Sequence, residues 1–193
     1  MRDTKMTKTV GEHWVCAELA RRGWAPALTR DGLERTDILA VGTHLPDRPT
    51  IEVQVKTATE GRTDDATSWP LGTKSQQPAL NKREWFALVM LPEVSAAMRC
   101  FIVPRDHVAA GAWIQHMRWL TDPTAPRGAR NAPVDRARTR ATTFARYEGR
   151  WDLLDKKTDH TPVLLRPELR DLAQTTEVGL PPDHPWRKNL PDW

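Results

Sequence analysis

The alternation of apolar and polar residues from Ile51 to Thr57 constrains the fold more than any other feature of the sequence. β-branched residues occupy every second position, and the positions between them are polar: Glu52, Gln54 and Lys56. Successive side chains of a strand point to opposite faces of a sheet. The segment is therefore predicted to be a strand with one face in the core and three polar side chains on the other. That polar row is either the solvated side of an edge strand or part of a functional site.

The segments around this strand predict an α/β protein. Residues 9–23 are predicted to form a helix, with Thr9 as its N-cap and Glu12 completing a capping box. Further strands are expected at residues 24–29, 37–41, 85–91 and 99–103, with a short strand near 69–71. A second helix is predicted from Asp106 to about Leu120. This order predicts a mixed central sheet flanked by helices, a three-layer α/β architecture.

The chain length of 193 residues suits one domain with peripheral additions. We expect this domain to span residues 1–157, with a core at 9–120 and a basic extension at about 127–157 that is helical from Arg136 to Leu154. The tail, residues 158–193, is rich in proline and is expected to run extended over the domain surface. No apolar run is long enough to cross a bilayer, and the N-terminus lacks an apolar signal segment. A cytoplasmic protein without membrane contact is therefore expected.

Cysteine and histidine positions point to structural roles. Cys16 and Cys100 both lie in apolar surroundings, which favours two reduced core thiols over a disulfide. No Cys/His spacing is typical of a zinc site. The histidines His13, His44 and His107 are interpreted as surface or cap residues rather than ligands.

Positive charge is concentrated late in the chain. The formal net charge is +4, whereas residues 127–150 hold seven arginines against Asp135 and Glu148 and are net +5. Arginine pairs with phosphate in a fixed fork geometry, so the block is either a nucleic-acid contact or a solvated basic segment. The residues predicted to contact nucleic acid include two lysines from the loop after the polar strand: Arg136, Arg138, Arg140, Arg146, Lys74 and Lys82.

Two carboxylates accompany the polar strand. Glu12 shares a helix face with Val15 and Leu19, and a carboxylate on an apolar face is costly unless it is compensated. The compensation is either the capping box with Thr9 or a metal site. Asp37 opens the preceding strand, and a hairpin connection would bring it near the end of the polar row. Taken alone, Asp37 is better interpreted as a turn residue.

In this order the motifs resemble the PD-(D/E)XK nuclease superfamily, the restriction-endonuclease-like fold. The resemblance covers roughly residues 9–104 and rests on Thr9-Val10-Gly11-Glu12, Thr36-Asp37-Ile38-Leu39-Ala40 and Val53-Gln54-Val55-Lys56-Thr57. It implies that Asp37 and Gln54 bind a divalent metal and that Glu12 completes the metal shell. It also implies that Lys56 orients or activates the attacking water. Glu52 adds a further metal ligand if it reaches in from the same strand face.

Two positions depart from the pattern of the family. Thr36 stands where the motif has proline, and Gln54 stands where most members have Asp or Glu. A Gln carbonyl oxygen can ligate Mg²⁺ but brings no charge, so it contributes less to metal affinity than a carboxylate does.

The resemblance implies a metal-dependent nuclease. Hard oxygen ligands favour Mg²⁺ or Mn²⁺ as the cofactor, and the expected partner is nucleic acid, with DNA as the substrate. A homodimer is a further expectation, since many relatives cut two strands as dimers. We expect Glu12, Asp37, Gln54 and Lys56 to line one concave pocket. One alternative is a nuclease fold that only binds nucleic acid, and the neutral residue Gln54 is the feature that favours it. The other is a small α/β interaction protein with a solvated polar strand.

Overall fold

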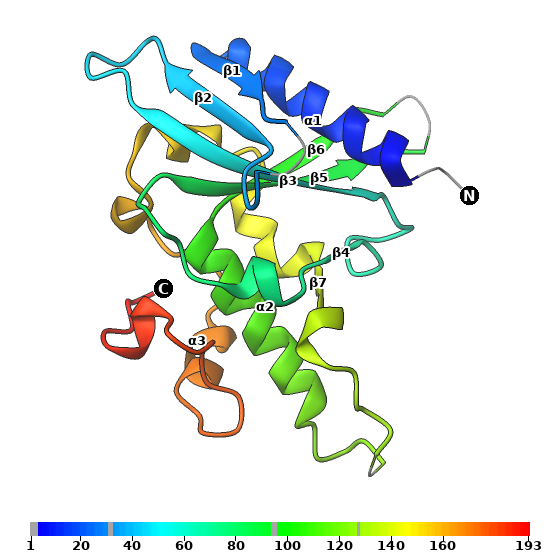
Figure 1. The fold of residues 1–193 in the computed structure, drawn as a ribbon. Coiled ribbons are helices and arrows are strands. Elements are labelled where there is room, and N and C mark those ends of the chain that lie inside the picture. The colour runs from blue at the N-terminus through cyan, green and yellow to red at the C-terminus, as the bar shows by residue number, and fades with distance from the viewer. Residues whose placement is uncertain (1–3, 31–32, 94–95, 127) are drawn as a thin grey trace.

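The fold is built around a five-stranded mixed sheet, as seen in a computed structural model that describes residues 4–30, 33–93, 96–126 and 128–193 (Figure 1). The strand order across the sheet is β1-β2-β3-β5-β6. The strands of this sheet are β1 (Trp24–Leu28), β2 (Ile38–Gly42), β3 (Thr50–Thr59), β5 (Glu84–Leu91) and β6 (Arg99–Pro104). The predicted strands are therefore confirmed, with small shifts at their ends.

Two helices cover opposite faces of this sheet. Helix α1 (Thr4–Ala20) lies above it in Figure 1 and helix α2 (Arg105–Leu120) lies below. A Cβ atom added to Gly11 of α1 would lie only 1.9 Å from Oγ1 of Thr57, so the helix approaches β3 closely at this point. The predicted α/β class, a mixed sheet flanked by helices in three layers, is confirmed.

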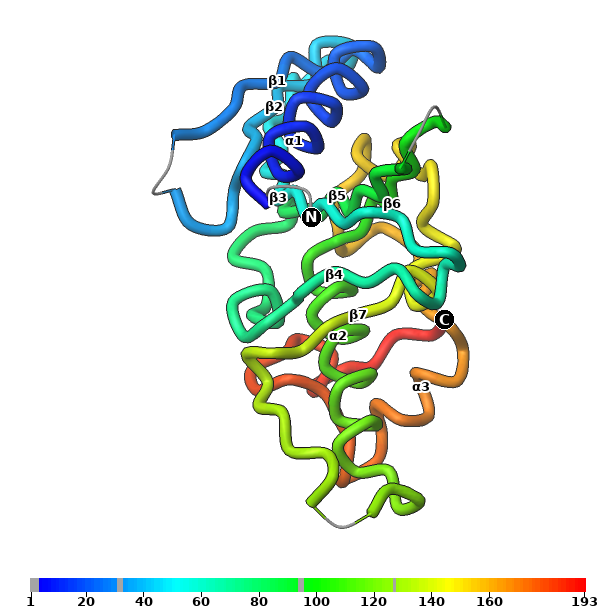
Figure 2. Tube along the Cα trace, turned by 90° about the vertical axis from the view of Figure 1, so that its right-hand side faces the viewer, coloured from blue at the N-terminus to red at the C-terminus, as the bar shows by residue number. Residues whose placement is uncertain are grey.

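The connection between β3 and β5 replaces the usual crossover helix. β3 and β5 are parallel, and the other neighbours in the sheet are antiparallel. Residues 60–83 cross over without an α-helix, through strand β4 (Ser68–Pro70) and a 3₁₀ helix at Thr73–Gln76. β4 pairs with β7 (Arg138–Arg140) in a separate two-stranded sheet, and Figure 2 shows the two strands side by side. Trp69 anchors this sheet to the core, because its Nε1 donates to the Val89 carbonyl at 3.0 Å.

The alternating burial of side chains along β3 agrees with the prediction. Ile51, Val53 and Val55 are almost fully buried, whereas the polar residues between them are half-buried. β5 lies in the middle of the sheet between β3 and β6, and all of its residues except the last are buried. A strand with neighbours on both edges and helices on both faces has no solvated side, which explains its continuous apolar sequence.

The N-terminal helix begins earlier than predicted, so the capping-box prediction is wrong. α1 already includes Thr4, and Thr9 lies inside it. The Thr9 hydroxyl donates to the Lys5 carbonyl at 3.0 Å, a bond within the helix rather than a cap. The polar residues before Thr9 are compatible with helix, and polar helix residues carry no apolar period that would have revealed them.

The stretch from Arg136 to Leu154 is not the single helix that was predicted, although much of it from Thr142 onward is 3₁₀-helical. This stretch forms β7 and short 3₁₀ helices at Val134–Arg136, Ala141–Tyr147 and Trp151–Asp155. Thr139 pairs with Trp69 of β4, so this part of the chain is extended. β-branched threonines here lower the helix propensity, and a tertiary strand partner is then sufficient to override it.

The C-terminal segment does not simply run extended over the surface. It contains helix α3 (Glu168–Ala173) and a 3₁₀ helix at Pro185–Arg187. Leu164, Leu165 and Leu169 are buried and belong to the main hydrophobic cluster. Burial of these leucines stabilises the attachment, since each fully buried leucine is worth roughly 1.5–3 kcal/mol.

Both cysteines and one histidine lie in the core or at its edge. Cys16 and Cys100 are both free, as predicted, with Cys100 buried and Cys16 half-buried. His107, in contrast, was expected at the surface and is 3% exposed on α2, with Nδ1 2.7 Å from the Tyr147 hydroxyl. In the part of the chain that the structure describes, no helix is long and apolar enough to span a membrane.

Candidate functional site

Asp37 is held against β3 by two hydrogen bonds. Its backbone N–H donates to the Val53 carbonyl at 2.9 Å, and its Oδ2 accepts the Val55 N–H at 2.8 Å. The paired register of β2 and β3 ends with Ile38 opposite Val53, and Asp37 directly precedes that pair. The hairpin between β2 and β3 therefore brings Asp37 next to the polar row, as the sequence analysis anticipated.

Glu12 meets Asp37 through a shared cation, the ammonium group of Lys8. Lys8 Nζ lies 3.2 Å from Glu12 Oε1 and 3.5 Å from Asp37 Oδ1. Burial raises the pKa of Glu12, and the negative charge of Asp37 adds to this, although the hydrogen bond from Lys8 opposes both. Burial by itself lowers the pKa of Lys8, but its contacts with Glu12 and Asp37 outweigh this and raise the pKa above its usual value. Two acidic groups and one basic group therefore depend on each other electrostatically.

A small hollow of about 140 Å³ opens at this point. It lies between the N-terminal half of α1 and the segments that follow β1 and precede β2. The residues that line it are Lys8, Glu12, Leu28, Thr29, Arg30, Leu33, Thr36 and Asp37. Glu12 and Asp37 are thus brought together, whereas Gln54 and Lys56 are not among the described residues that line the hollow.

The side chain of Gln54 lies on the face of the sheet that is opposite α1. α1 packs on the side of β3 that carries Thr57, and alternate residues such as Gln54 face the other way. There the Oε1 of Gln54 accepts a hydrogen bond from Nη2 of Arg105, at the start of α2, at 2.9 Å. Glu12 and the side chain of Gln54 therefore lie on opposite sides of the sheet, and Asp37 is bonded to the backbone of the two residues that flank Gln54.

Lys56 is half-buried two residues further along β3. Burial lowers the pKa of its ammonium group, the positive charges of Lys8 and Arg105 lower it further, and the carboxylate of Asp37 partly compensates. A lysine that is partly desolvated beside a carboxylate is a common feature of functional sites, although structural networks also perturb lysines.

Glu52 is occupied by protein donors. Its Oε2 accepts from the Thr36 hydroxyl at 2.9 Å, and its Oε1 accepts from Asn81 Nδ2 at 2.8 Å. Thr36, which replaces the proline of the motif, is 3% exposed. Its hydroxyl therefore has a structural use that proline would not provide, because it ties the start of β2 to β3.

A buried ion-pair network supports Gln54 and was missed by the sequence analysis. Glu84 Oε2 lies 2.6 Å from Arg105 Nε and 2.9 Å from Arg35 Nη2, and the Arg105 side chain is 1% exposed. The Arg105 guanidinium also stacks over Phe86, 4.6 Å from the ring centroid. Burial and the charge of Arg35 lower the pKa of Arg105 to about 10, while Glu84 counteracts them. A charged residue at the first position of an apolar strand, Glu84, was the one available signal.

The predicted nucleic-acid residues fall into two groups. Four of them already contact other protein groups: Arg138 with Ser68, Arg140 with Asp65, Lys74 with Glu34 and Lys82 with Asp159. Arg136 and Arg146 are exposed, and their side chains make no hydrogen bond or ion pair with the described residues. These two are therefore the members of the arginine block that are available to a phosphate without breaking an existing contact.

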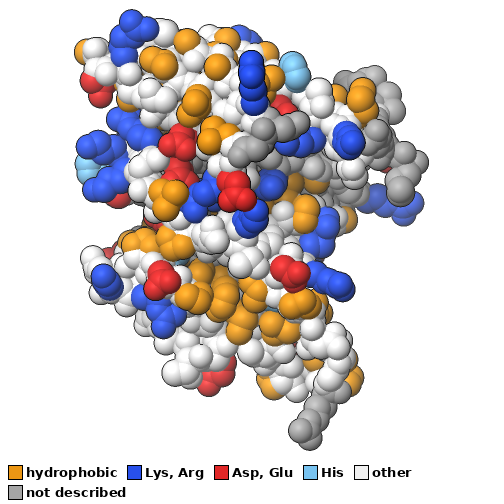
Figure 3. Space-filling model, in the orientation of Figure 1, with side chains coloured by type: hydrophobic (Ala, Val, Ile, Leu, Met, Phe, Trp, Pro, Cys, Tyr) orange, Lys and Arg blue, Asp and Glu red, His pale blue; other side chains and the backbone are white. Residues whose placement is uncertain are grey.

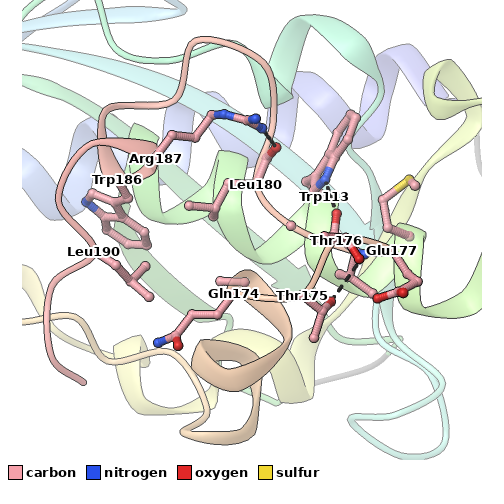
Figure 4. A pocket seen from close by; sticks show the side chains of 13 residues that line it. Trp113, Gln174, Thr175, Thr176, Glu177, Leu180, Trp186, Arg187 and Leu190 are labelled. Carbon is pink, nitrogen blue, oxygen red and sulfur yellow. Dashed lines mark hydrogen bonds between the residues drawn. The ribbon is translucent and has the colours of Figure 1, made fainter.

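A larger pocket lies elsewhere, between α2 and the C-terminal segment. Its volume is about 650 Å³, and Figure 4 shows Trp113, Leu180 and Trp186 around it. Figure 3 shows apolar side chains gathered in this lower region of the molecule, with mixed charges above. None of the residues predicted for the site is among the described residues that line this pocket.

The donor set at Asp37 suits a weakly held Mg²⁺ rather than a closed metal cage. Within the described ranges, no group of three or more His, Cys, Asp or Glu residues could hold a metal ion. Mg²⁺, however, keeps several waters and is commonly held by one or two carboxylates together with substrate phosphates. Glu12 and Asp37 provide such a pair.

Comparison of the chain with family models, with curated proteins and with solved structures found no match.

Proposed function

We propose that this protein is a Mg²⁺- or Mn²⁺-dependent nuclease that hydrolyses phosphodiester bonds in DNA. The observation that carries the proposal is the convergence of Glu12 and Asp37 on one cation, Lys8. The half-buried Lys56 is close enough for the charges of Asp37 and Lys8 to affect its pKa. Phosphodiester hydrolysis needs positive charge on the phosphate and a nucleophilic water, and these residues are suited to arrange both.

Each residue has a distinct role in this proposal. Glu12 and Asp37 hold the divalent ion, which when bound neutralises phosphate charge and lowers the pKa of a coordinated water. Lys56, whose ammonium group senses the charge of Asp37, donates to the phosphate or orients the water. Its position on β3 is rigid, because the neighbouring Val55 N–H is bonded to Asp37 Oδ2.

Gln54 takes a supporting role. Its Oε1 already accepts from Arg105, which is itself paired with Glu84. We therefore assign Gln54 to positioning the end of β3, and place Glu52 among the structural residues because both of its oxygens have protein donors.

Cleavage assays with conservative variants test the proposal. Purified protein is incubated with linear, supercoiled and single-stranded DNA in Mg²⁺, Mn²⁺ or EDTA. Asp37→Asn keeps an oxygen for the Val55 N–H but removes the charge, so it should abolish cleavage without unfolding the protein. Lys56→Met should abolish cleavage with little loss of metal affinity. Lys188→Met, at an exposed position in the C-terminal segment, is the matched control and should cleave normally. Cleavage that survives EDTA or Asp37→Asn would contradict the proposal.

The second candidate function is a nuclease fold that binds nucleic acid without cutting it. The specific observation in its favour is that residue 54 is neutral and already bonded to Arg105. Cleavage of DNA, measured together with its retention by the protein at low salt, separates the two functions. Because Arg105 lies within hydrogen-bond distance, we expect Glu at position 54 to pair with it and to leave Mn²⁺ affinity unchanged. No cleavage of any substrate, combined with retention on DNA at low salt, would favour the binding module.

A further inference from the structure

We propose that Lys8 is the resident counter-ion of the Glu12–Asp37 pair, and that a divalent cation binds these carboxylates by displacing its ammonium group. This inference rests on the proposed function. Lys8 Nζ lies 3.2 Å from Glu12 Oε1 and 3.5 Å from Asp37 Oδ1. A hard metal ion would take ligands from the same two carboxylates. The ammonium group and the metal therefore compete for one position.

Lys8 is the partner that is free to leave. Its side chain is 55% exposed, against 15% for Glu12 and 19% for Asp37. Asp37 is fixed to β3 through the Val55 N–H, whereas Lys8 reaches the site on a flexible four-carbon stem and its ammonium group is readily hydrated. The ammonium group can move into water without any change in the backbone.

The charges favour this exchange more strongly when a further anion is present. The carboxylate pair carries two negative charges against one on Lys8, so a divalent ion balances the pair and leaves the ammonium group without a partner. Arg30 lines the same hollow, and its side chain makes no hydrogen bond or ion pair with the described residues. A DNA phosphate entering the hollow would provide the anion that Lys8 and Arg30 lack. Metal binding is thereby weakened in the free protein and coupled to substrate binding.

Mn²⁺ titrations of the intact protein test this inference independently of cleavage. Binding is measured by calorimetry, or by the electron paramagnetic resonance signal of free Mn²⁺, in the absence of DNA. Lys8→Met keeps the apolar stem and removes the charge, and Lys8→Gln serves as a second variant. Both should bind Mn²⁺ about tenfold more tightly than the wild type, because a competing charge a few ångström from the ion is lost. Lys188→Met removes a charge in the C-terminal segment and should leave affinity within about twofold of the wild type.

The outcomes separate this inference from the proposed function. Tighter binding in both Lys8 variants, with binding lost in Asp37→Asn, supports Lys8 as a counter-ion. Unchanged or weaker binding in the Lys8 variants, with binding still lost in Asp37→Asn, overturns the role of Lys8 and leaves the metal site of the nuclease intact. No Mn²⁺ binding by the wild type or by either Lys8 variant overturns both.

Discussion

His107 is expected to make the stability of this protein fall steeply below neutral pH. Its Nδ1 lies 2.7 Å from the Tyr147 hydroxyl, and that hydroxyl accepts the Leu164 N–H at 2.8 Å. The hydroxyl keeps its own proton to donate, and Nδ1 of a neutral imidazole can accept it. Burial, with a smaller contribution from the charge of His184, lowers the pKa of His107 to about 3.

The sign and size of the effect follow from the two states of this histidine. The unfolded chain binds a proton at His107 with an ordinary pKa of about 6.5, and the folded chain resists doing so. The stabilising contribution is therefore complete above pH 6.5 and is lost progressively as the pH falls toward 3. Between pH 8 and pH 5 this one group should lower the free energy of unfolding by about 2 kcal/mol.

Urea unfolding at a series of pH values, followed by tryptophan fluorescence, measures this contribution. The comparison is between the wild type and His107→Asn, whose side-chain oxygen can still accept from Tyr147. The stability advantage of the wild type should shrink by about 2 kcal/mol from pH 8 to pH 5, because only the wild type loses this contribution. His160→Asn, at a position where the side chain is 70% exposed, removes a histidine without disturbing the interior and serves as the control. A wild-type advantage over His107→Asn that stays constant with pH would refute the reasoning.

Three other changes test the buried ion pair, the helix–sheet contact and the arginine block. Glu84→Gln leaves buried Arg105 without its counter-charge and should lower the free energy of unfolding by about 3–5 kcal/mol in urea titrations; a loss below about 1 kcal/mol would contradict the pairing. Gly11→Ala forces a methyl group against Thr57 and should cost about 1–3 kcal/mol in the same assay, whereas a neutral effect would mean that α1 can shift. Joint replacement of Arg136 and Arg146 by Ala should flatten the log–log salt dependence of duplex DNA binding by about 2, and an unchanged slope would mean that these arginines are only solvated.

The local sequence pattern was sufficient to predict the strands of the sheet. The alternation in β3 reflects a period of two that burial imposes on a strand with one apolar face. The continuous apolar run of β5 follows in the same way from a strand covered on both faces. The hairpin between β2 and β3 is short in sequence, so the proximity of Asp37 to Gln54 was also predictable from local order.

Distant contacts decided what local pattern could not. The segment around Thr139 is extended because it pairs with β4, far away in sequence, and the C-terminal leucines are buried because the core has space for them. Thr9 was a poor guide to the start of α1, since a capping motif is only a local preference and polar residues before it continued the helix.

The candidate site shows the same division. The residue types at Glu12, Asp37 and Lys56 are a property of the sequence, and they were identified from its spacing. That Lys8 lies between the two carboxylates, and that Arg105 holds Gln54 in the opposite layer, depends on how α1 and α2 dock on either face of the sheet. Docking is decided by side-chain packing across the whole core, whereas sequence periodicity reports only which face of each element is buried.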